Sequence, residues 1–431
     1  MVLAFSVDMI KYTIRLLSFL ILAFLSSSLF AGEVPNIDKI YRERIYNVKL
    51  YTSLEGPQGL SPITTIQQTN PLILEFDDLG DEPQNYYFKL YHCNADWTVS
   101  YLNSSQYLYD FNEFRITDRE MSYSTRTLYY RHATTIPKVK VSGNYLVKVY
   151  RNYDEDDLVL TKRMVVYESS CNIVPDIRRS VIPADAFTKQ QVNFKVIYNN
   201  IMVANTFQDF KIVVRQNYRW DNARTNLRPT FVRDYEKTLD YDFYNNETAF
   251  NGLNEFRYFD MRSVRFNGIY MGKVVRNNDF AEVWILEEAS RKGLTYTFYD
   301  DINGAFLPEL YETQNRTIEP DYAVVHFKLN AKTPAPGDVY IVGGFNQNLI
   351  EERYKMTYDD TLKAYVGSFW MKQGYYNYMY TVVNAGMRDD TYFEGNSSLT
   401  ENAYDIIVYA RVQGELYDRA VGYFQQRFRG R

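Results

Sequence analysis

The stretch Tyr91–Trp97 reads YHCNADW, and the polar run TVSYLNSSQYLYDFNEFRITD follows it directly. Before it, apolar and aromatic residues recur at every second position from Tyr86 to His92, which is the period of a half-buried β-strand. Neighbouring residues of a strand point to opposite faces, so His92 and Cys93 are poorly placed to act together as base and nucleophile. We therefore interpret the stretch as a structural signature of an aromatic-rich β-sandwich, with Trp97 packing a strand corner.

The composition of the whole chain supports this interpretation. Aromatic residues make up 17% of the 431 residues, with 41 tyrosines, and such side chains favour pleated, half-buried surfaces. A chain of this length is expected to contain two to three domains. The net charge of −5, without a basic stripe, argues against nucleic acid as a partner. Three histidines and two cysteines leave little material for a zinc site.

Residues 1–31 have the organisation of a secretory signal peptide. Lys11 and Arg15 form a positive start, Leu16–Leu25 is apolar, and small residues follow up to Ala31. The apolar run has about ten residues, against the roughly 20 needed to cross a bilayer. We expect an exported protein, cleaved near Ala31, with no direct membrane span.

The two cysteines lie far apart in the sequence. An oxidising compartment permits a disulfide between them. Cys93 ends a strand inside the first block of strands, whereas Cys171 lies at the boundary that follows it. Because geometry decides whether two cysteines can be bridged, the sequence leaves this bond open.

Beyond the signal peptide, period-two alternation recurs and divides into three β-rich blocks. The first, 40–169, closes with two strands joined by a short acidic turn at 154–157. The second is 172–320 and the third is 321–431. We expect an all-β protein of tandem immunoglobulin-like β-sandwich domains with these boundaries.

The second block contains less regular segments. Asp234–Glu255 is polar and is expected to form an extended loop. Phe280–Leu286 and Leu294–Tyr299 are predicted strands, and Asn303–Gly304 after them favours a hairpin turn.

No set of residues in the sequence points to a particular chemical reaction. Asp301–Gly304 resembles the start of a calcium loop, but its glycine comes too early, so a plain turn is the better interpretation. His132 and His326 have no acid or cysteine at a suitable spacing, and no metalloprotease, nucleophile-elbow or nucleotide-binding motif occurs. We expect a protein that is not an enzyme, with no catalytic, cofactor-binding or metal-binding residues.

One aromatic and cationic cluster is a candidate for partner binding. Tyr218, Arg219 and Trp220 lie together in a polar segment of the second block. Trp, Tyr and Arg are the residues most often found at interface hot spots. The alternative is that Trp220 packs at the edge of its own domain and closes it.

The third block resembles the immunoglobulin-like early-set domains that include the glycogen-binding modules. This resemblance is carried by its segments VYIVGGFNQN and YYNYMYTVVN. In those modules a Trp follows the FN corner by two positions and stacks on sugar, whereas Asn348 stands at that place here. The resemblance therefore implies the fold. An exported carbohydrate-binding β-sandwich protein is the alternative function.

Four ordered segments together resemble one family. They are YHCNADWTVSYLNSSQYL, SGNYLVKVY, RWDNARTNLRPTF and NEFRYFDMRS, and they are similar to the type IX secretion system plug proteins of the Bacteroidetes group. The resemblance covers nearly the whole mature chain. It implies a periplasmic protein that docks on the large outer-membrane β-barrel translocon and closes its periplasmic opening when idle. No catalytic residue and no cofactor come with it.

A third possibility is that the chain itself forms an outer-membrane barrel, since such proteins also combine a signal peptide, many tyrosines and alternating strands. Polar loops interrupt the alternation on both sides, and the aromatic residues are not confined to strand ends. The chain also closes on Arg427–Arg431 rather than on an aromatic residue. These features disfavour a barrel.

Overall fold

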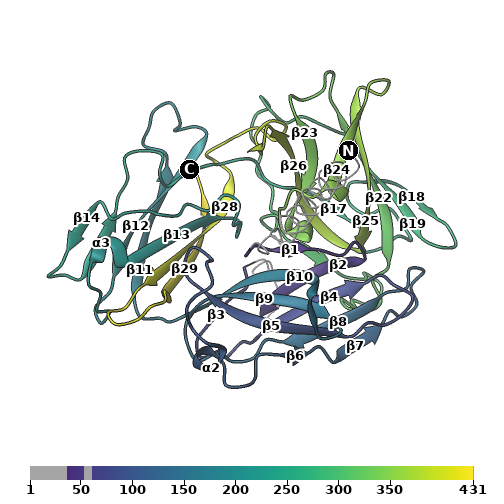
Figure 1. Cartoon of the computed structure of the whole chain (residues 1–431). Helices are drawn as coiled ribbons and strands as arrows, with labels where there is room; N and C mark the ends of the chain where they lie inside the picture. Colours follow the sequence, from purple (N-terminus) through teal and green to yellow (C-terminus); the bar gives the residue numbers. More distant parts are fainter. Residues whose placement is uncertain (1–35, 53–60, 431) are drawn as a thin grey trace, which may run out of the picture. The chain divides into compact units, whose positions relative to one another are not determined.

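The computed structural model describes residues 36–52 and 61–430, and it is nearly all β (Figure 1). The described chain from Ile37 onward forms one compact unit. Stacked β-sheets make up its architecture, so the predicted all-β class with several β-sandwiches is confirmed. The predicted signal peptide, with its cleavage near Ala31, lies outside the described residues.

The first sandwich contains two sheets within residues 39–167 and has its core between them. Leu74, Phe88 and Val147 are fully buried there, and each contributes roughly 2 kcal/mol relative to an exposed position. One sheet has the order β1 (Lys39–Ile40), β10 (Asp154–Tyr167), β9 (Gly143–Arg151), β5 (Tyr86–Cys93) and β6 (Phe114–Arg115), with β3 (Ile63–Thr65) beside β10. The other has the order β2 (Ile45–Thr52), β4 (Leu72–Asp78), β8 (Tyr130–Thr135) and β7 (Asp118–Met121). A short helix, α2 (Ser104–Tyr107), follows β5.

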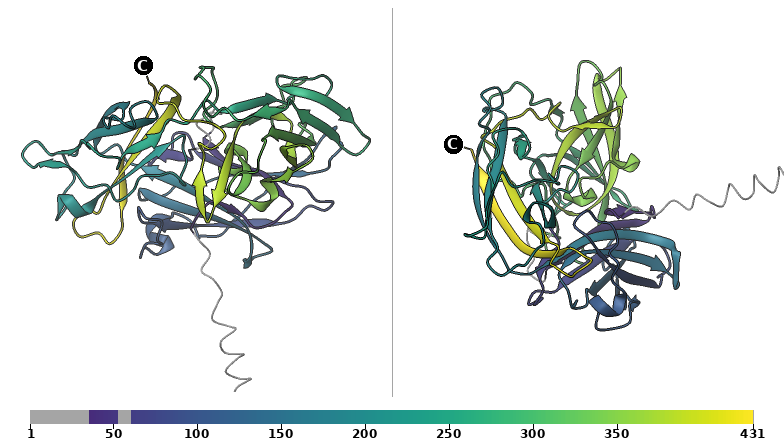
Figure 2. Two further views of the ribbon diagram at one scale, coloured as in Figure 1. Left: turned by 90° about the horizontal axis from the view of Figure 1, so that it is seen from above. Right: turned by 60° about the vertical axis from the view of Figure 1, so that its left-hand side comes forward.

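The middle sandwich combines two distant parts of the chain. Its first sheet has the order β11 (Asn172–Arg179), β12 (Lys189–Ile197), β15 (Thr238–Tyr241) and β14 (Phe231–Arg233), with β16 (Ala249–Asn251) beside β12. Its second sheet is β13 (Phe210–Gln216), which follows helix α3 (Thr206–Asp209), then β28 (Glu401–Ala410) and β29 (Arg419–Arg429). Figures 1 and 2 show the yellow β28 and β29 beside the teal β11 and β13. Val192, Ile212 and Ile406 lie in the shared core.

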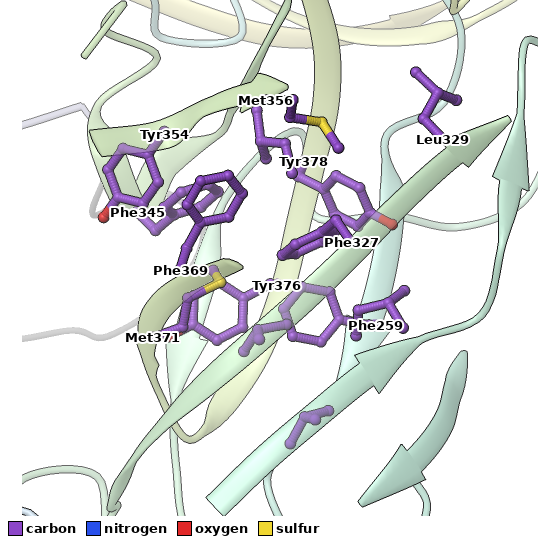
Figure 3. Close-up of a cluster of buried hydrophobic side chains, with 14 of the residues drawn as sticks. Phe259, Phe327, Leu329, Phe345, Tyr354, Met356, Phe369, Met371, Tyr376 and Tyr378 are labelled. Carbon is purple, nitrogen blue, oxygen red and sulfur yellow. The ribbon is translucent and has the colours of Figure 1, made fainter. Parts of the chain in front are cut away.

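The third sandwich is one continuous path of paired strands between residues 257 and 389. Phe259 of β17 contacts Phe327 of β22 across the core, and its ring stacks on Tyr376 at 5.1 Å (Figure 3). The path runs β17 (Arg257–Asp260), β26 (Gly374–Asn384), β23 (Asp338–Val342), β24 (Lys355–Asp359), β25 (Ala364–Lys372), β22 (Tyr322–Asn330), β19 (Ala281–Ile285) and β18 (Met271–Arg276). Beside it lie β20 (Glu288–Ala289), β21 (Phe306–Pro308) and β27 (Met387–Asp389), with short 3-10 turns η2 (Gly344–Asn346) and η3 (Glu352–Tyr354).

The strands are grouped differently from the predicted blocks 172–320 and 321–431. Strands between 257 and 308 belong to the third sandwich, whereas the hairpin 401–429 completes the middle one. The third sandwich is therefore inserted between β16 and β28 of the middle sandwich. Alternation identifies a strand but carries no information about a partner almost 200 residues away, so consecutive blocks were the simplest expectation.

Three local expectations in the second block also need correction. The expected loop Asp234–Glu255 contains strands β15 and β16. No strand forms over Leu294–Tyr299, although the structure describes these residues, so the turn at Asn303–Gly304 leads into no hairpin with them. Instead β21, just after this turn, pairs with β26. The expected strand Phe280–Leu286 is confirmed as β19.

Deleting residues 401–431 is expected to unfold the middle sandwich, because two of the three strands of its second sheet are lost and the shared core is exposed. Amide hydrogen exchange should show loss of protection in β12 and β13, with β9 of the first sandwich still protected. Strong protection of β12 and β13 in the shortened chain would contradict the shared core.

Candidate interaction site

His92 and Cys93 have separate, structural surroundings. His92 is buried, with its Nδ1 2.9 Å from the Oγ of Ser100 and its Nε2 3.1 Å from the carbonyl oxygen of Ser142. Burial lowers the pKa of His92 to about 4, so the ring is neutral at physiological pH. Burial also raises the pKa of the Cys93 thiol to about 12. Cys93 and Cys171 are both free thiols.

The segment that resembles a calcium loop is a closed turn. Asp301 accepts hydrogen bonds from the backbone N–H of Phe256 at 2.6 Å and of Asn303 at 2.7 Å. Asn303 and Gly304 both adopt the left-handed backbone conformation, with φ of 52° and 80°. Across residues 36–52 and 61–430, no group of three or more acidic, histidine or cysteine side chains is placed to hold a metal ion.

The predicted partner-binding residues Tyr218, Arg219 and Trp220 make internal contacts. Tyr218 and Arg219 are buried, and Trp220 is half-buried. Arg219 donates to Asp221 at 2.6 Å and to Asp390 at 2.7 Å, which joins the middle sandwich to the third. Partner binding by this cluster stays a prediction, but its described contacts hold the chain's own sheets together.

Trp220 also contacts Trp97, the last residue of the YHCNADW stretch. Trp97 has a φ of 68° and its ring meets Trp220 edge-on, with centroids 4.9 Å apart. The guanidinium of Arg215 lies 4.2 Å from the Trp220 ring, and that of Arg163 lies 5.0 Å from it. Stacking of this kind stabilises a desolvated cation. The two sequence signatures therefore meet where the first and middle sandwiches touch.

A fully buried ion pair lies beside these rings. Arg215 of β13 donates to both carboxylate oxygens of Asp405 of β28, at 2.9 and 2.6 Å, and both side chains have 0% exposure. The same guanidinium donates to Ser61 Oγ of the first sandwich at 2.7 Å. One arginine thus links the two sheet strands to a residue more than 150 positions away.

A second buried charge joins the first sandwich to the third. Lys372 of β25 donates to Asp77 of β4 at 2.7 Å and to the carbonyl oxygen of Thr317 at 2.7 Å. Tyr322 donates to the same Asp77 carboxylate, also at 2.7 Å. Buried charges are tolerated only when paired in this way. The joint is therefore specific to one arrangement of the two sandwiches.

A third polar site lies where the chain passes from the middle sandwich to the third and where it returns. Leu253 accepts from Ser397 at 2.8 Å, so the outgoing and returning chain segments are hydrogen-bonded to each other. Glu255, just beyond, is buried, accepts from Tyr296 and from the backbone N–H of Glu401, and lies near Asp301. Burial, together with the Asp301 carboxylate, raises the pKa of Glu255 to about 7.

Large aromatic side chains stand exposed on the first sandwich. Tyr101 is 84% exposed and Phe111 is 81% exposed, and Tyr109 lies between them in the sequence. All three belong to 99–111, the segment around α2, which we call the aromatic segment. Sequence reasoning missed these residues as a site, because an aromatic residue between polar ones gives no sign of which face it occupies.

The residue that replaces the sugar-stacking Trp of glycogen-binding modules is not available at the surface. Asn348 is 6% exposed, and its carbonyl oxygen accepts from Arg388 at 2.6 Å. The position therefore provides no platform for stacking a sugar.

Comparison with known proteins assigns the first sandwich to a family. Residues 45–168 match the family model described as the type 9 secretion system plug protein 1st domain. A hypothetical protein from Parabacteroides merdae ATCC 43184, known from a crystal structure at 2.30 Å resolution, is 30% identical to this chain, with a TM-score of 0.86. That alignment covers 92% of this chain and 100% of the solved one. None of the curated proteins matches.

Asp405→Ala is expected to lower the free energy of unfolding by about 3–5 kcal/mol, because it leaves Arg215 buried without its counter-ion. Replacing both partners, as Arg215→Met with Asp405→Leu, should cost less than the single change, since no charge is then left unpaired. Urea unfolding measures both. A cost below about 1 kcal/mol for Asp405→Ala would contradict this account of the pair.

Glu255→Gln is expected to stabilise the protein at pH 8. The carboxyl titrates near pH 7 in the folded chain and near its ordinary 4.5 when unfolded, so its contribution to stability falls as the pH rises between these values. The amide removes this penalty, which amounts to at most about 3 kcal/mol above pH 7, and should give no gain at pH 4. Denaturant unfolding at the two pH values tests this, with the exposed Glu82→Gln as control. An equal gain at both values would refute the raised pKa.

Proposed function

We propose that this chain, which belongs to the type 9 secretion system plug protein family, docks on the large outer-membrane β-barrel translocon of that system. It closes the periplasmic opening of the translocon when no substrate is passing. The family match at 45–168 is the observation that carries this proposal. The family is that of a secretion-system plug and is not an enzyme family, which agrees with a role in gating without a cofactor.

The proposed location is the periplasm, in peripheral association with the outer membrane. The signal-peptide pattern of residues 1–31 supports export, with cleavage near Ala31. The family implies a place in the cell envelope. In the part of the chain that the structure describes, no helix has the length and apolar character to cross a bilayer.

The contacts between the sandwiches are suited to a protein that blocks a pore. A body that blocks a pore must keep its shape under load, and flexible linkers between domains would work against this. Here Arg215 and Lys372 each bridge two sandwiches through buried, charge-assisted hydrogen bonds. The third sandwich is also connected to the middle one at both of its chain ends, which restricts hinge motion.

We place the docking surface on the aromatic segment of the first sandwich. The family model covers this sandwich, and Tyr101, Tyr109 and Phe111 are its most exposed aromatic side chains. Tyr and Phe are enriched at protein interfaces because they bury a large area with few rotatable bonds. Lys140, whose ammonium lies 5.2 Å from the Tyr109 ring, adds a charge beside these rings.

Affinity purification of tagged protein from detergent-solubilised outer membrane tests the docking. The unchanged chain should retain a barrel of very high mass. Tyr101→Ser with Phe111→Ser should reduce the retained barrel by about tenfold or more, since truncating an interface hot spot costs roughly 2 kcal/mol or more. Phe187→Ser with Tyr235→Ser is the matched control, because these aromatic residues are 77% and 101% exposed on the middle sandwich.

The outcomes separate two claims. If the unchanged chain never retains the barrel, the plug role is wrong. If the control pair loses the barrel as strongly as Tyr101→Ser with Phe111→Ser, the plug role stands but the aromatic segment is not the docking surface.

A further inference from the structure

The two sheets of the middle sandwich open into a cleft along one side. The cleft has a volume of about 810 Å³ and is lined by Ile177–Arg179 of β11 and by Arg427–Gly430 around the end of β29. Both strands are edge strands, since β11 pairs only with β12 and β29 only with β28 in the described chain. Volumes of this size are typical of ligand-binding sites.

Backbone hydrogen bonds join the chain at the start of β11 to β29. The N–H groups of Ser170 and Cys171 donate to the carbonyl oxygen of Val421, at 2.9 and 3.2 Å. The cleft is lined by the far ends of the same two strands, at 177–179 and 427–430. It therefore lies beyond a hydrogen-bonded joint between β11 and β29.

The charge of the lining is strongly one-sided. Its seven residues include four arginines and no acid. Arg178 is paired with Asp242 at 3.1 Å and Arg427 with Glu401 at 3.5 Å, both pairs being partly exposed. Within the described residues, neither Arg179 nor Arg429 forms an ion pair, and Arg429 is hydrogen-bonded to Tyr296.

Strand alternation gives the cleft an apolar floor on the side of the sandwich core. Ile177 and Phe428 both pack against the core of the middle sandwich. Arg179 shares the strand face of Ile177, so it is directed toward the gap, and its Nε is buried without a hydrogen-bond partner in the structure described. Arg429 follows Phe428 and therefore lies on the opposite face of β29, where its guanidinium is 3.5 Å from the centroid of the Phe298 ring.

The edge of β11 also presents free backbone groups to the cleft. Ser180 donates to Lys189 of β12, and Cys171 donates toward β29. Because consecutive residues of a strand face opposite neighbours, the backbone groups of Ile177 and Arg179 face away from β12. Neither of them donates or accepts a backbone hydrogen bond toward β29 among the described residues. An edge of this kind can pair with an added strand.

We propose that this cleft binds an extended acidic peptide segment of a partner protein. The segment adds a strand along β11. On its face toward the core, an apolar side chain covers Ile177 and Phe428, and an acidic side chain two positions along meets Arg179. Acidic side chains on its opposite face meet Arg429. A free phosphate or a lipid headgroup would use the charges alone, whereas the exposed strand edge and the apolar floor match a peptide. The inference goes beyond the plug role and does not depend on it.

Fluorescence anisotropy with the purified protein tests this directly. The probe is a fluorescein-labelled peptide about seven residues long, with a central valine and glutamate at the other positions, and its reference is the same peptide with glutamine in place of glutamate. We expect the acidic probe to bind at least about tenfold more tightly than the neutral one, with an affinity that falls as salt rises. Arg179→Ala with Arg429→Ala should weaken binding about tenfold or more.

Two controls accompany this measurement. Arg265→Ala with Arg276→Ala removes exposed arginines elsewhere and should leave binding unchanged. A probe that is N-methylated at alternate residues, which cannot pair as a strand, should not bind. The proposal is overturned if the neutral probe binds equally well, if the Arg179 and Arg429 changes have no effect, or if inorganic phosphate or anionic vesicles bind these arginines as tightly as the peptide.

Discussion

The pairing of β13 with β28 is the constraint on which the rest of the structure depends. It runs from Phe210 opposite Ala410 to Gln216 opposite Tyr404, and without it the first sheet of the middle sandwich would have no second sheet to cover it. Closing so long a loop carries an entropic cost, which the shared core and the buried Arg215–Asp405 pair must offset. The chain between the two strands is long enough to form a complete sandwich, so the third sandwich is built within the loop.

The contacts between sandwiches are polar and specific rather than simply apolar. Arg215 reaches Ser61, Lys372 reaches Asp77, and Arg219 reaches Asp390, each across a boundary between sandwiches. A buried charge has few alternative partners, so these pairs favour one relative arrangement even where their net contribution to stability is small. This is the property expected of a rigid plug, and it explains why charged residues that look like surface residues in the sequence are buried.

The candidate sites were only partly predictable for the same reason. Tyr218, Arg219 and Trp220 have the composition of a binding hot spot, but that composition also suits an internal joint, and Trp97 and Asp390 come to meet them only in the folded chain. Tyr101 and Phe111 lie in a quoted motif, yet nothing in the sequence separates an exposed aromatic residue from a buried one. The arginine cleft joins residues some 250 positions apart, so no local pattern could identify it.

The sequence by itself determined the all-β class, most of the strands, the structural character of His92 and Cys93, and the family, because these depend on side-chain periodicity and on ordered motifs. Tertiary structure alone decided which strands pair, where the third sandwich is inserted, and which polar residues are buried. Period-two alternation shows that a strand has an inner and an outer face. The partner that covers the inner face is chosen by packing and charge pairing across hundreds of residues, and these interactions exist only when the whole chain has folded.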